Sequence, residues 1–407
     1  WRRRIASPAT SSDTAKEPDR MGEVRTPDDV HDLVRGLTLL GTGGGGRPEQ
    51  GLECLLPHVE ADRAVSWIAP DAIPDDAWVC STFGMGSIAP TEPLSVAQRR
   101  VLGYPDAGTV AKPMVRAVQE LEAYTGRKVA AILPFELGAG NTASPMDAAV
   151  RVGAAIVDGD CAGRAIPELC QTSAAIAGIP FAPGAIADSW GNVLLVKETA
   201  SELLAERIGK LVSIATKVPD MTAQCAHAGF LMQGKDLKRI AVPGGITRAL
   251  AVGRAIRAAR ARGVDPVAAA AEALNGWVLF RGCVEQKQWE SREGYMYGTT
   301  IVEGDGPDAG HTLRVWFKNE NHVTWRDGTP WVCSPDLIMT IGVDGTPYTN
   351  TLLPEGARIG VVGAVADPRL RTPAALDLLG PRHYGYDLPY LPIEQLVRQR
   401  AARADGE

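Results

Sequence analysis

The sequence predicts an α/β protein with a three-layer α/β N-terminal domain, built on a largely parallel sheet, and a smaller α+β C-terminal domain rich in antiparallel sheet. Three observations lead to this prediction. Apolar segments of strand length alternate with amphipathic helical segments through the first half, a pattern typical of parallel α/β layers. The second half contains short alternating strands separated by Asp-Gly dipeptides, which favour hairpin turns. The 407 residues, with 44 glycines and 29 prolines, provide enough chain for two domains with many tight turns.

The N-terminal domain is expected to span residues 27–185. Its first helix follows Thr26, a suitable N-cap, and Pro27 fits the first helical position; apolar residues then recur at helical spacing until Gly41. The remaining predicted elements of this domain are, in chain order, strands at 64–69 and 78–82, a helix at 113–124, a strand at 128–134, a helix at 146–152 and a strand at 154–157. Residues 1–26 lack apolar periodicity and are expected to form a disordered tail.

The C-terminal domain is expected to span residues 186–392, because the chain becomes rich in Gly, Pro and Ala around 178–188. The predicted elements are a strand at 193–196, helices at 199–210, 247–262 and 266–274, and several short strands between 277 and about 366. The dipeptides Asp327-Gly328 and Asp344-Gly345 mark turns within this last region. Residues 393–407 are expected to be a polar tail.

Composition excludes several classes of protein. A net charge of -6 argues against a dedicated nucleic-acid binder, and purely apolar runs such as 361–366 are far shorter than the roughly 18 residues of a membrane span. The seven cysteines form no C-x-x-C pair, and their odd number cannot be fully paired within one chain, so we expect reduced thiols and a cytoplasmic protein. The expected partner is a small-molecule substrate, and we expect a homo-oligomer.

A run of glycines follows the first predicted helix. Residues 41–46 match G-x-G-x-x-G, but a dinucleotide-binding loop follows a strand, and this one follows a helix. A phosphate-binding Walker loop is also excluded, since Arg47-Pro48 stands where Lys and Ser or Thr are required. Two interpretations remain, a structural turn and a loop beside the active site that binds an anion or a carbonyl. The residues of the second interpretation are Thr42, Gly43, Gly44 and Gly45.

Two polar loops follow predicted buried strands, where open α/β sheets bind their ligands. The first carries Glu136 and Asn141; the asparagine suits ligand binding, while Asn141 or Ser144 capping the next helix is the alternative. The second has three carboxylates and one arginine within eleven residues. These groups could activate water, hold a divalent metal ion, clamp a substrate carboxylate, or form a structural ion-pair network. They are Asp158, Asp160, Arg164 and Glu168.

A third polar segment lies in the second half. Glu320 stands between Asn319 and Asn321, an arrangement that suits hydrogen bonding to a polar ring, although a hairpin explains some of the polarity. The sequence contains no G-x-S-x-G elbow and no H-E-x-x-H motif. The residues present are therefore most compatible with carboxylate-assisted addition of water to a polar small molecule.

Six motifs together resemble the S-methyl-thiohydantoin desulfurase family, in the expected order and over about residues 27–392. They lie at 39–46, 134–141, 158–168, 319–321, 335–338 and 380–387. Where the family commonly reads Gln-Asn-Glu-Asn and then an apolar residue, this chain has Lys318 before the motif and His322 after it. The resemblance implies an α/β domain followed by a smaller β-rich domain. It also implies hydrolysis of an S-methylated thiohydantoin with a propionate arm, giving the hydantoin and methanethiol.

The residues and the resemblance together give a leading hypothesis. Water, activated by a carboxylate, adds to the ring carbon that carries the sulfur, and methanethiol leaves. The candidate bases are Glu136, Asp158, Asp160 and Glu168. Asn141, Asn319 and Asn321 would hold the ring and Arg164 its carboxylate arm, with the glycine loop stabilising charge that develops on the ring.

Two alternatives stay open at this point. One is a hydantoin or lactam ring-opening amidohydrolase with a divalent metal ion among Asp158, Asp160 and Glu168. The other is a non-catalytic subunit of a hydantoinase or oxoprolinase complex, since other members of the resembled family look like partners of such proteins.

Overall fold

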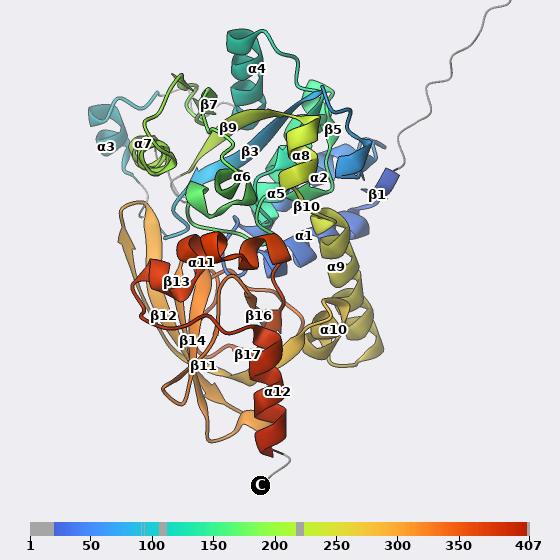
Figure 1. Ribbon diagram of the computed structural model, residues 1–407, viewed down its shortest axis with the longest axis vertical. Helices are drawn as coiled ribbons and strands as arrows, with labels where there is room; N and C mark the ends of the chain where they lie inside the picture. The colour runs from blue at the N-terminus through green and yellow to red at the C-terminus, as the bar shows by residue number, and fades with distance from the viewer. Residues whose placement is uncertain (1–19, 91, 93, 106–111, 217–223, 405–407) are drawn as a thin grey trace, which may run out of the picture.

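The structure is a computed structural model that describes residues 20–90, 92, 94–105, 112–216 and 224–404. Two large sheets dominate it, a mixed sheet of six strands in the upper part of Figure 1 and an antiparallel sheet of seven strands in the lower part. The mixed α/β class is as predicted. None of the helices in the described ranges is long and apolar enough to cross a membrane.

The six-stranded sheet has the order β5-β4-β3-β9-β7-β8. Its strands are β3 (Trp78–Gly86), β4 (Ala131–Pro134), β5 (Ala155–Ile156), β7 (Gly184–Ala187), β8 (Val193–Val196) and β9 (Gln224–Gln233). The β3–β4 and β4–β5 pairs are parallel, whereas β9 pairs antiparallel with both β3 and β7, and β7 with β8. The prediction of a largely parallel sheet is therefore wrong, because β9, which no sequence pattern indicated, enters the sheet beside β3 in the opposite direction.

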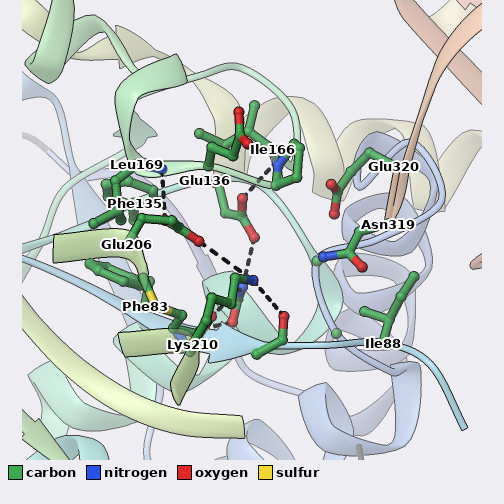
Figure 2. Close-up of a pocket in the computed structure, with 18 residues that line it drawn as sticks. Phe83, Ile88, Phe135, Glu136, Ile166, Leu169, Glu206, Lys210, Asn319 and Glu320 are labelled. Atoms are coloured by element: carbon green, nitrogen blue, oxygen red, sulfur yellow. Dashed lines mark hydrogen bonds and ion pairs between the residues drawn. The ribbon is translucent and has the colours of Figure 1, made fainter. Parts of the chain in front are cut away.

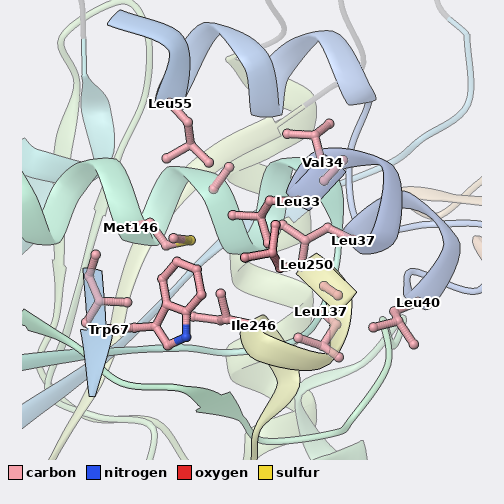
Figure 3. Close-up of a cluster of buried hydrophobic side chains, with 14 of the residues drawn as sticks. Leu33, Val34, Leu37, Leu40, Leu55, Trp67, Leu137, Met146, Ile246 and Leu250 are labelled. Atoms are coloured by element: carbon pink, nitrogen blue, oxygen red, sulfur yellow. The ribbon is translucent and has the colours of Figure 1, made fainter. Parts of the chain in front are cut away.

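Helices cover both faces of this sheet, so the three-layer arrangement is present. The helices of the chain up to residue 273 are α1 (Pro27–Leu40), α2 (Pro48–Val59), α3 (Val96–Val101), α4 (Pro113–Thr125), α5 (Ala139–Val152), α6 (Ser173–Ile176), α7 (Glu202–Ala215), α8 (Gly234–Ile240), α9 (Gly245–Arg262) and α10 (Pro266–Ala273). Of these, α10 packs on α9 and on the seven-stranded sheet. Side chains alternate along the strands, so that Cys80 and Ile132 join one apolar cluster while Val79 and Leu133 join another. Figure 3 shows the first cluster, where α1, α5 and α9 meet around Trp67.

Helix α1 forms where the sequence predicts it. The Thr26 hydroxyl accepts a hydrogen bond from the Asp29 amide at 3.2 Å, and the Asp29 carboxylate accepts one from the Thr26 amide at 3.2 Å, which is a capping box. The helix packs tightly on α9, which lies more than 200 residues later in the chain. A Cβ atom at Gly36 would lie only 1.8 Å from the Ala249 carbonyl oxygen. The first and second halves of the chain therefore share one helical layer.

The seven-stranded sheet is antiparallel throughout, as the Asp-Gly turns predict, in the order β15-β14-β13-β12-β11-β17-β16. Its strands are β11 (Trp277–Arg292), β12 (Tyr295–Gly304), β13 (Thr312–Lys318), β14 (Glu320–Arg326), β15 (Thr329–Cys333), β16 (Leu337–Gly342) and β17 (Arg358–Ala364). The turn between β13 and β14 is very tight, because Lys318 pairs with Glu320 and Asn319 alone forms the tip, with φ at 55°. Helices α11 (Pro373–Leu379) and α12 (Ile393–Ala404) follow, and β6 (Gly159–Asp160) pairs with β10 (Val242–Pro243).

Both predicted tails contain regular structure. Residues 20–24 of the N-terminal tail form β1 (Arg20–Val24), which pairs with β2 (Val65–Ile68); residues 1–19 lie outside the described residues. The C-terminal tail contains α12, because Ile393 and Leu396 bury an apolar side against the second sheet. The predicted boundary at 185 falls inside β7, in a sheet that also takes β8 and β9 from beyond it.

Candidate active site

A polar pocket lies where the two sheets approach each other. The ends of β3 and β4, the loop after α1, helix α7 and the β13–β14 turn all contribute to its wall (Figure 2). It has about 450 Å³ of empty space, which includes the part open to solvent. Of the residues predicted for the site, the pocket wall contains Gly45, Glu136, Asn141, Glu168, Asn319 and Glu320.

Glu136 is held at the end of β4 by hydrogen bonds to both carboxylate oxygens. The Asn141 side-chain amide donates to Oε1 at 2.6 Å, and the Ile166 backbone amide donates to Oε2 at 2.8 Å. Asn141 is itself fixed by two hydrogen bonds of 3.1 Å with the Gly84 backbone. Burial raises the pKa of Glu136 to about 7, although these hydrogen bonds and the charge of Lys210 lower it. This carboxyl group is therefore placed to exchange a proton near neutral pH.

Glu320 faces the same pocket from the opposite side (Figure 2). Its side chain is buried, and within the described part of the chain its Oε2 atom has no hydrogen-bond partner. Burial, and then the charge of Glu136, raise the pKa of Glu320 well above its ordinary value, although Arg164 and Lys210 oppose the shift. This shift favours the protonated form of Glu320, the form that can donate a proton.

Gly44 makes room for the Glu320 carboxyl group. A Cβ atom at Gly44 would lie 1.8 Å from Glu320 Oε1, so any larger residue would displace that group. The next glycine, Gly45, has φ at +75° and approaches the backbone of Gly138 so closely that a Cβ atom would lie 2.6 Å from its Cα. The carbonyl of Gly45 accepts hydrogen bonds of 3.0 Å from the amides of Gly140 and Asn141. The glycine loop is thus a piece of pocket wall built from main chain.

Thr42 and Gly43 lie deeper in the same loop and bind backbone rather than the pocket. The Thr42 carbonyl accepts from the Asn321 amide at 2.8 Å, and the Gly43 carbonyl accepts from the Asn350 amide at 2.7 Å. The Asn350 side chain donates to the Asn319 carbonyl at 2.7 Å and to Asn321 Oδ1 at 3.0 Å. Asn350 is therefore part of the frame of the site, and no motif in the sequence indicated it.

Helix α7 adds two charged residues that sequence reasoning also missed, Glu206 and Lys210. Lys210 Nζ donates to the Gly86 carbonyl at 2.7 Å, lies 3.6 Å from Glu206 Oε1, and stands 4.1 Å from the ring centre of Tyr295. Glu206 accepts hydrogen bonds of 2.9 Å from the Tyr295 hydroxyl and from the Leu169 amide. The spacing of four residues, Glu206 to Lys210, is the one signal that could have placed both on a single helix face.

Glu168 reaches the pocket but is already paired. Its carboxylate forms an ion pair with Lys318 and contacts His383 Nε2, and it accepts a hydrogen bond of 3.1 Å from Gln171. Burial alone would raise the pKa of Glu168, but His383 and Lys318 lower it to about 2. Such an acidic group is a poor proton acceptor at neutral pH, which argues against Glu168 as the general base.

Asp158 and Asp160 lie away from the pocket wall. Asp158 caps α9, since its Oδ1 accepts from the Ile246 and Thr247 amides at 2.9 and 3.1 Å. Asp160 Oδ1 accepts from the amides of Ala162 and Gly163 at 2.6 and 2.5 Å, and burial raises its pKa to about 8. Both carboxyl groups thus stabilise the loop and the helix that surround the site.

Arg164 and Asn321 also serve the frame of the site. Arg164 is fully buried, and its guanidinium donates to the carbonyls of Asn321 at 2.7 Å, Asp336 at 3.2 Å and Pro335 at 3.4 Å. Asn321 donates from its side chain to the Ile338 carbonyl at 3.0 Å. Because its donors are engaged by main chain, we do not assign Arg164 to a substrate carboxylate.

A metal ion does not fit the three carboxylates considered for it. Asp158, Asp160 and Glu168 bind backbone amides, a lysine and a histidine at separate places, so their oxygens do not converge. Among the residues that the structure describes, no group of three or more His, Cys, Asp or Glu side chains is arranged to hold a metal ion.

Comparisons with known proteins agree with this architecture. A search of curated proteins finds no match. A crystal structure of a protein from Chromobacterium violaceum has a TM-score of 0.71 to this chain, covers 91% of it and 100% of its own length, and is 24% identical in sequence, a likeness that shows a shared fold. Two family models also match, the S-Me-THD-like N-terminal domain over residues 28–198 and the S-Me-THD-like C-terminal domain over residues 199–393. Since these matches run from residue 28 to residue 393, the chain belongs to the S-methyl-thiohydantoin desulfurase-like family.

Proposed function

We propose that this protein is a hydrolase of a hydantoin-like five-membered ring, converting an S-methyl-thiohydantoin to the hydantoin and methanethiol. The observation that carries the proposal is the pair of buried carboxyl groups, Glu136 and Glu320, on opposite sides of one pocket. Their different surroundings bring the pKa of Glu136 to about 7 and raise that of Glu320 well above its ordinary value, which favours a protonated Glu320. One base and one acid at a single site are the requirement for adding water across a carbon–nitrogen double bond.

In the proposed addition step, ionised Glu136 removes a proton from water as the water oxygen bonds to the ring carbon that carries the S-methyl group. The electron pair of the carbon–nitrogen double bond moves to the ring nitrogen, which takes the proton of Glu320. The product is a tetrahedral carbon that carries a hydroxyl group, the S-methyl group and a protonated nitrogen.

In the elimination step, the carbon–sulfur bond breaks and the sulfur takes the proton held by Glu136, so that methanethiol leaves. The hydroxyl group returns its proton to Glu320 and becomes the ring carbonyl. Both glutamates regain their starting states, and the sum is one water consumed for one thiol released. Asn141 holds Glu136 in position through its 2.6 Å hydrogen bond.

The test is to incubate purified protein with S-methyl-thiohydantoin propionate and measure thiol release with a colorimetric thiol reagent. We expect turnover, and we expect Glu136→Gln to lower kcat/KM by about 10²- to 10⁴-fold, the usual contribution of a general base. Glu272→Gln, which changes an exposed carboxylate on α10, is the matched control and should retain full activity. Absence of thiol release by a folded wild-type protein would reject this substrate.

The same preparation distinguishes two other functions. Opening of a hydantoin or lactam ring, together with stoichiometric metal in elemental analysis, would replace the proposal with a metal-assisted amidohydrolase. Lack of turnover by the isolated chain, with stable co-purification of a hydantoinase-like protein, would replace it with a non-catalytic subunit.

A further inference from the structure

Helix α7 has its polar residues inside and its apolar residues outside. The residues buried under it are Glu206, Gly209, Lys210 and Ser213. Its exposed large apolar residues are Leu203, Leu204, Ile208, Leu211 and Ile214, with exposed fractions between 43% and 66%. A surface helix of a monomeric protein normally buries its apolar side and exposes its polar side. The exposed apolar side of α7 therefore indicates a site of interaction with another molecule.

The apolar face of α7 continues onto neighbouring elements. Val196 of β8 and Ala205 of α7 line one small cavity, and Leu194, two residues before Val196, lies on the same face of that strand and is 37% exposed. The Tyr104 hydroxyl donates to the Ala215 carbonyl at 3.0 Å, which ties the end of α3 to the end of α7. Figure 1 shows α3 beside α7 at the same end of the molecule. We define the α7 patch as Leu194, Leu203, Leu204, Ile208, Leu211 and Ile214, with Val96, Val101 and Leu102 of α3 at its edge.

We propose that the α7 patch is the centre of a two-fold interface between two copies of this chain, in which the two α7 helices pack antiparallel. A two-fold contact brings the same surface of each copy together, so the surface must be compatible with itself. Leu204, Ile208 and Leu211 are spaced by four and three residues, the spacing with which side chains of two helices interdigitate. Ile208 lies midway and would sit next to the symmetry axis.

Size and charge both favour a second copy as the occupant. A standard protein–protein interface buries roughly 800 Å² and 20–30 residues on each partner, around an apolar centre. The aliphatic residues of the α7 patch, with α3 at its edge, fit the apolar centre of an interface of this size. The chain carries a net charge of -6, and Arg207 is the one charged residue among the exposed positions of α7, so two copies can meet here without opposing like-charged clusters. A membrane-surface helix would instead present a polar face rich in Lys and Arg to water. The polar face of α7 is instead buried, and Glu206 and Lys210 of that face line the pocket.

The interface would also support the candidate active site. Glu206 and Lys210 enter the pocket from the inner side of the same helix whose outer side meets the second copy. The second copy would therefore hold α7 against the pocket. This inference does not depend on which ring the pocket binds, and its test measures mass rather than turnover.

The experiment is sedimentation velocity, with light scattering after gel filtration, on the full chain over a wide range of concentration. We expect the wild type at twice the mass of the chain, and the double variant Leu204→Glu/Leu211→Glu at the mass of one chain with an unchanged circular dichroism spectrum. The matched control is Val264→Glu/Val343→Glu, which changes two exposed apolar residues away from α7 and should stay dimeric. A monomeric wild-type protein would overturn the proposal, whether or not it binds lipid vesicles. A Leu204→Glu/Leu211→Glu variant that stays dimeric would also overturn it.

If the double variant does not fold, a cysteine near the symmetry axis gives an independent test. Ile208→Cys should form a disulfide-linked dimer under mild oxidation, whereas Val264→Cys, at a similarly exposed position outside the patch, should not. The seven native cysteines are buried or half-buried and free, so the wild type provides the background. Failure of Ile208→Cys to cross-link at concentrations where the protein is dimeric would place the interface elsewhere and overturn the assignment to α7.

Discussion

Glu136 and Asp160 are buried and Glu168 is half-buried, and the pKa values of these three carboxyl groups move in different directions. Burial raises the pKa of Glu136 to about 7 and that of Asp160 to about 8, while His383 and Lys318 bring that of Glu168 to about 2 despite its burial. The difference comes from the partners of each group, since Asp160 accepts hydrogen bonds from backbone amides and Glu168 is paired with the side chains of Lys318 and His383. The sequence places all three beside strand ends but contains no information about which of them acquires a counter-ion.

The pH dependence of the proposed reaction should report on Glu136. A base must be ionised to act, so kcat/KM should rise as the pH increases through about 7, and it should fall again at higher pH, where Glu320 loses the proton that it donates. Lys210 lowers the pKa of Glu136, so Lys210→Met should move this rise to higher pH. Lys238→Met, which changes a surface lysine paired with Asp75, should leave the profile unchanged. A profile that does not move in Lys210→Met would show that another group controls the rise.

Asp160 offers a test that separates stability from catalysis. Because its pKa is raised, the folded state keeps a proton that the unfolded state loses, so its contribution to stability is present at low pH and disappears as the pH rises through about 8. Asp160→Asn keeps Oδ1 as an acceptor for Ala162 and Gly163 without the cost of a buried charge. We expect it to raise the melting temperature more at pH 9 than at pH 6, with activity retained. A loss of activity of about a hundredfold, in the range of a general base, would return Asp160 to the list of candidate bases.

At the level of elements, helices and strands with strong local signals were predictable from the sequence, whereas the pairing of distant segments was not. Helix α1 was predictable because its capping box and apolar periodicity lie within fifteen residues of chain. By contrast, β9 lies in the middle of the six-stranded sheet only because β3 and β7 accept it on either side. Likewise, Asp158 is a helix cap whose partners lie 88 and 89 residues away, so its role could not be read from its own loop.

The glycine loop should tolerate change poorly at one position in particular. Gly44→Ala places a methyl group against the Glu320 carboxyl, so we expect a large loss of kcat/KM with only a small change in melting temperature. In a double-mutant cycle with Glu320→Gln, the losses should be far from additive, because both changes disturb the same acid. Additive losses would indicate that Gly44 acts through some other contact.

For the whole molecule, the two sheets are joined by buried polar contacts and by shared helices. Arg164 follows β6 in the first half of the chain and binds carbonyls of Asn321, Pro335 and Asp336 in the second. Helix α1 of the first half packs against α9 of the second. These contacts explain why the domain boundary predicted at residue 185 falls inside a sheet. The prediction used composition, which indicates where loops lie but not which distant segments contact each other.

Removing the Arg164 side chain should therefore weaken the entire fold. Arg164→Ala leaves several buried carbonyls without a donor, and each such group costs about 1–3 kcal/mol, so we expect the free energy of unfolding to fall by about 3 kcal/mol or more. Chemical denaturation monitored by tryptophan fluorescence measures this. Arg262→Ala, which removes an exposed arginine bonded to one carbonyl, is the control. Equal effects of the two substitutions would show that the junction does not depend on Arg164.

The use of bare main chain as a pocket wall has a consequence for mutational surveys of this protein. Alanine scanning works by removing side chains, and along the glycine loop it has nothing to remove. Here the informative perturbation is the opposite one, the stepwise addition of a methyl group, with Gly44 and Gly45 as the sensitive positions. A deep mutational scan should accordingly find this loop intolerant of every residue type, whereas the charged positions around it should accept selected replacements.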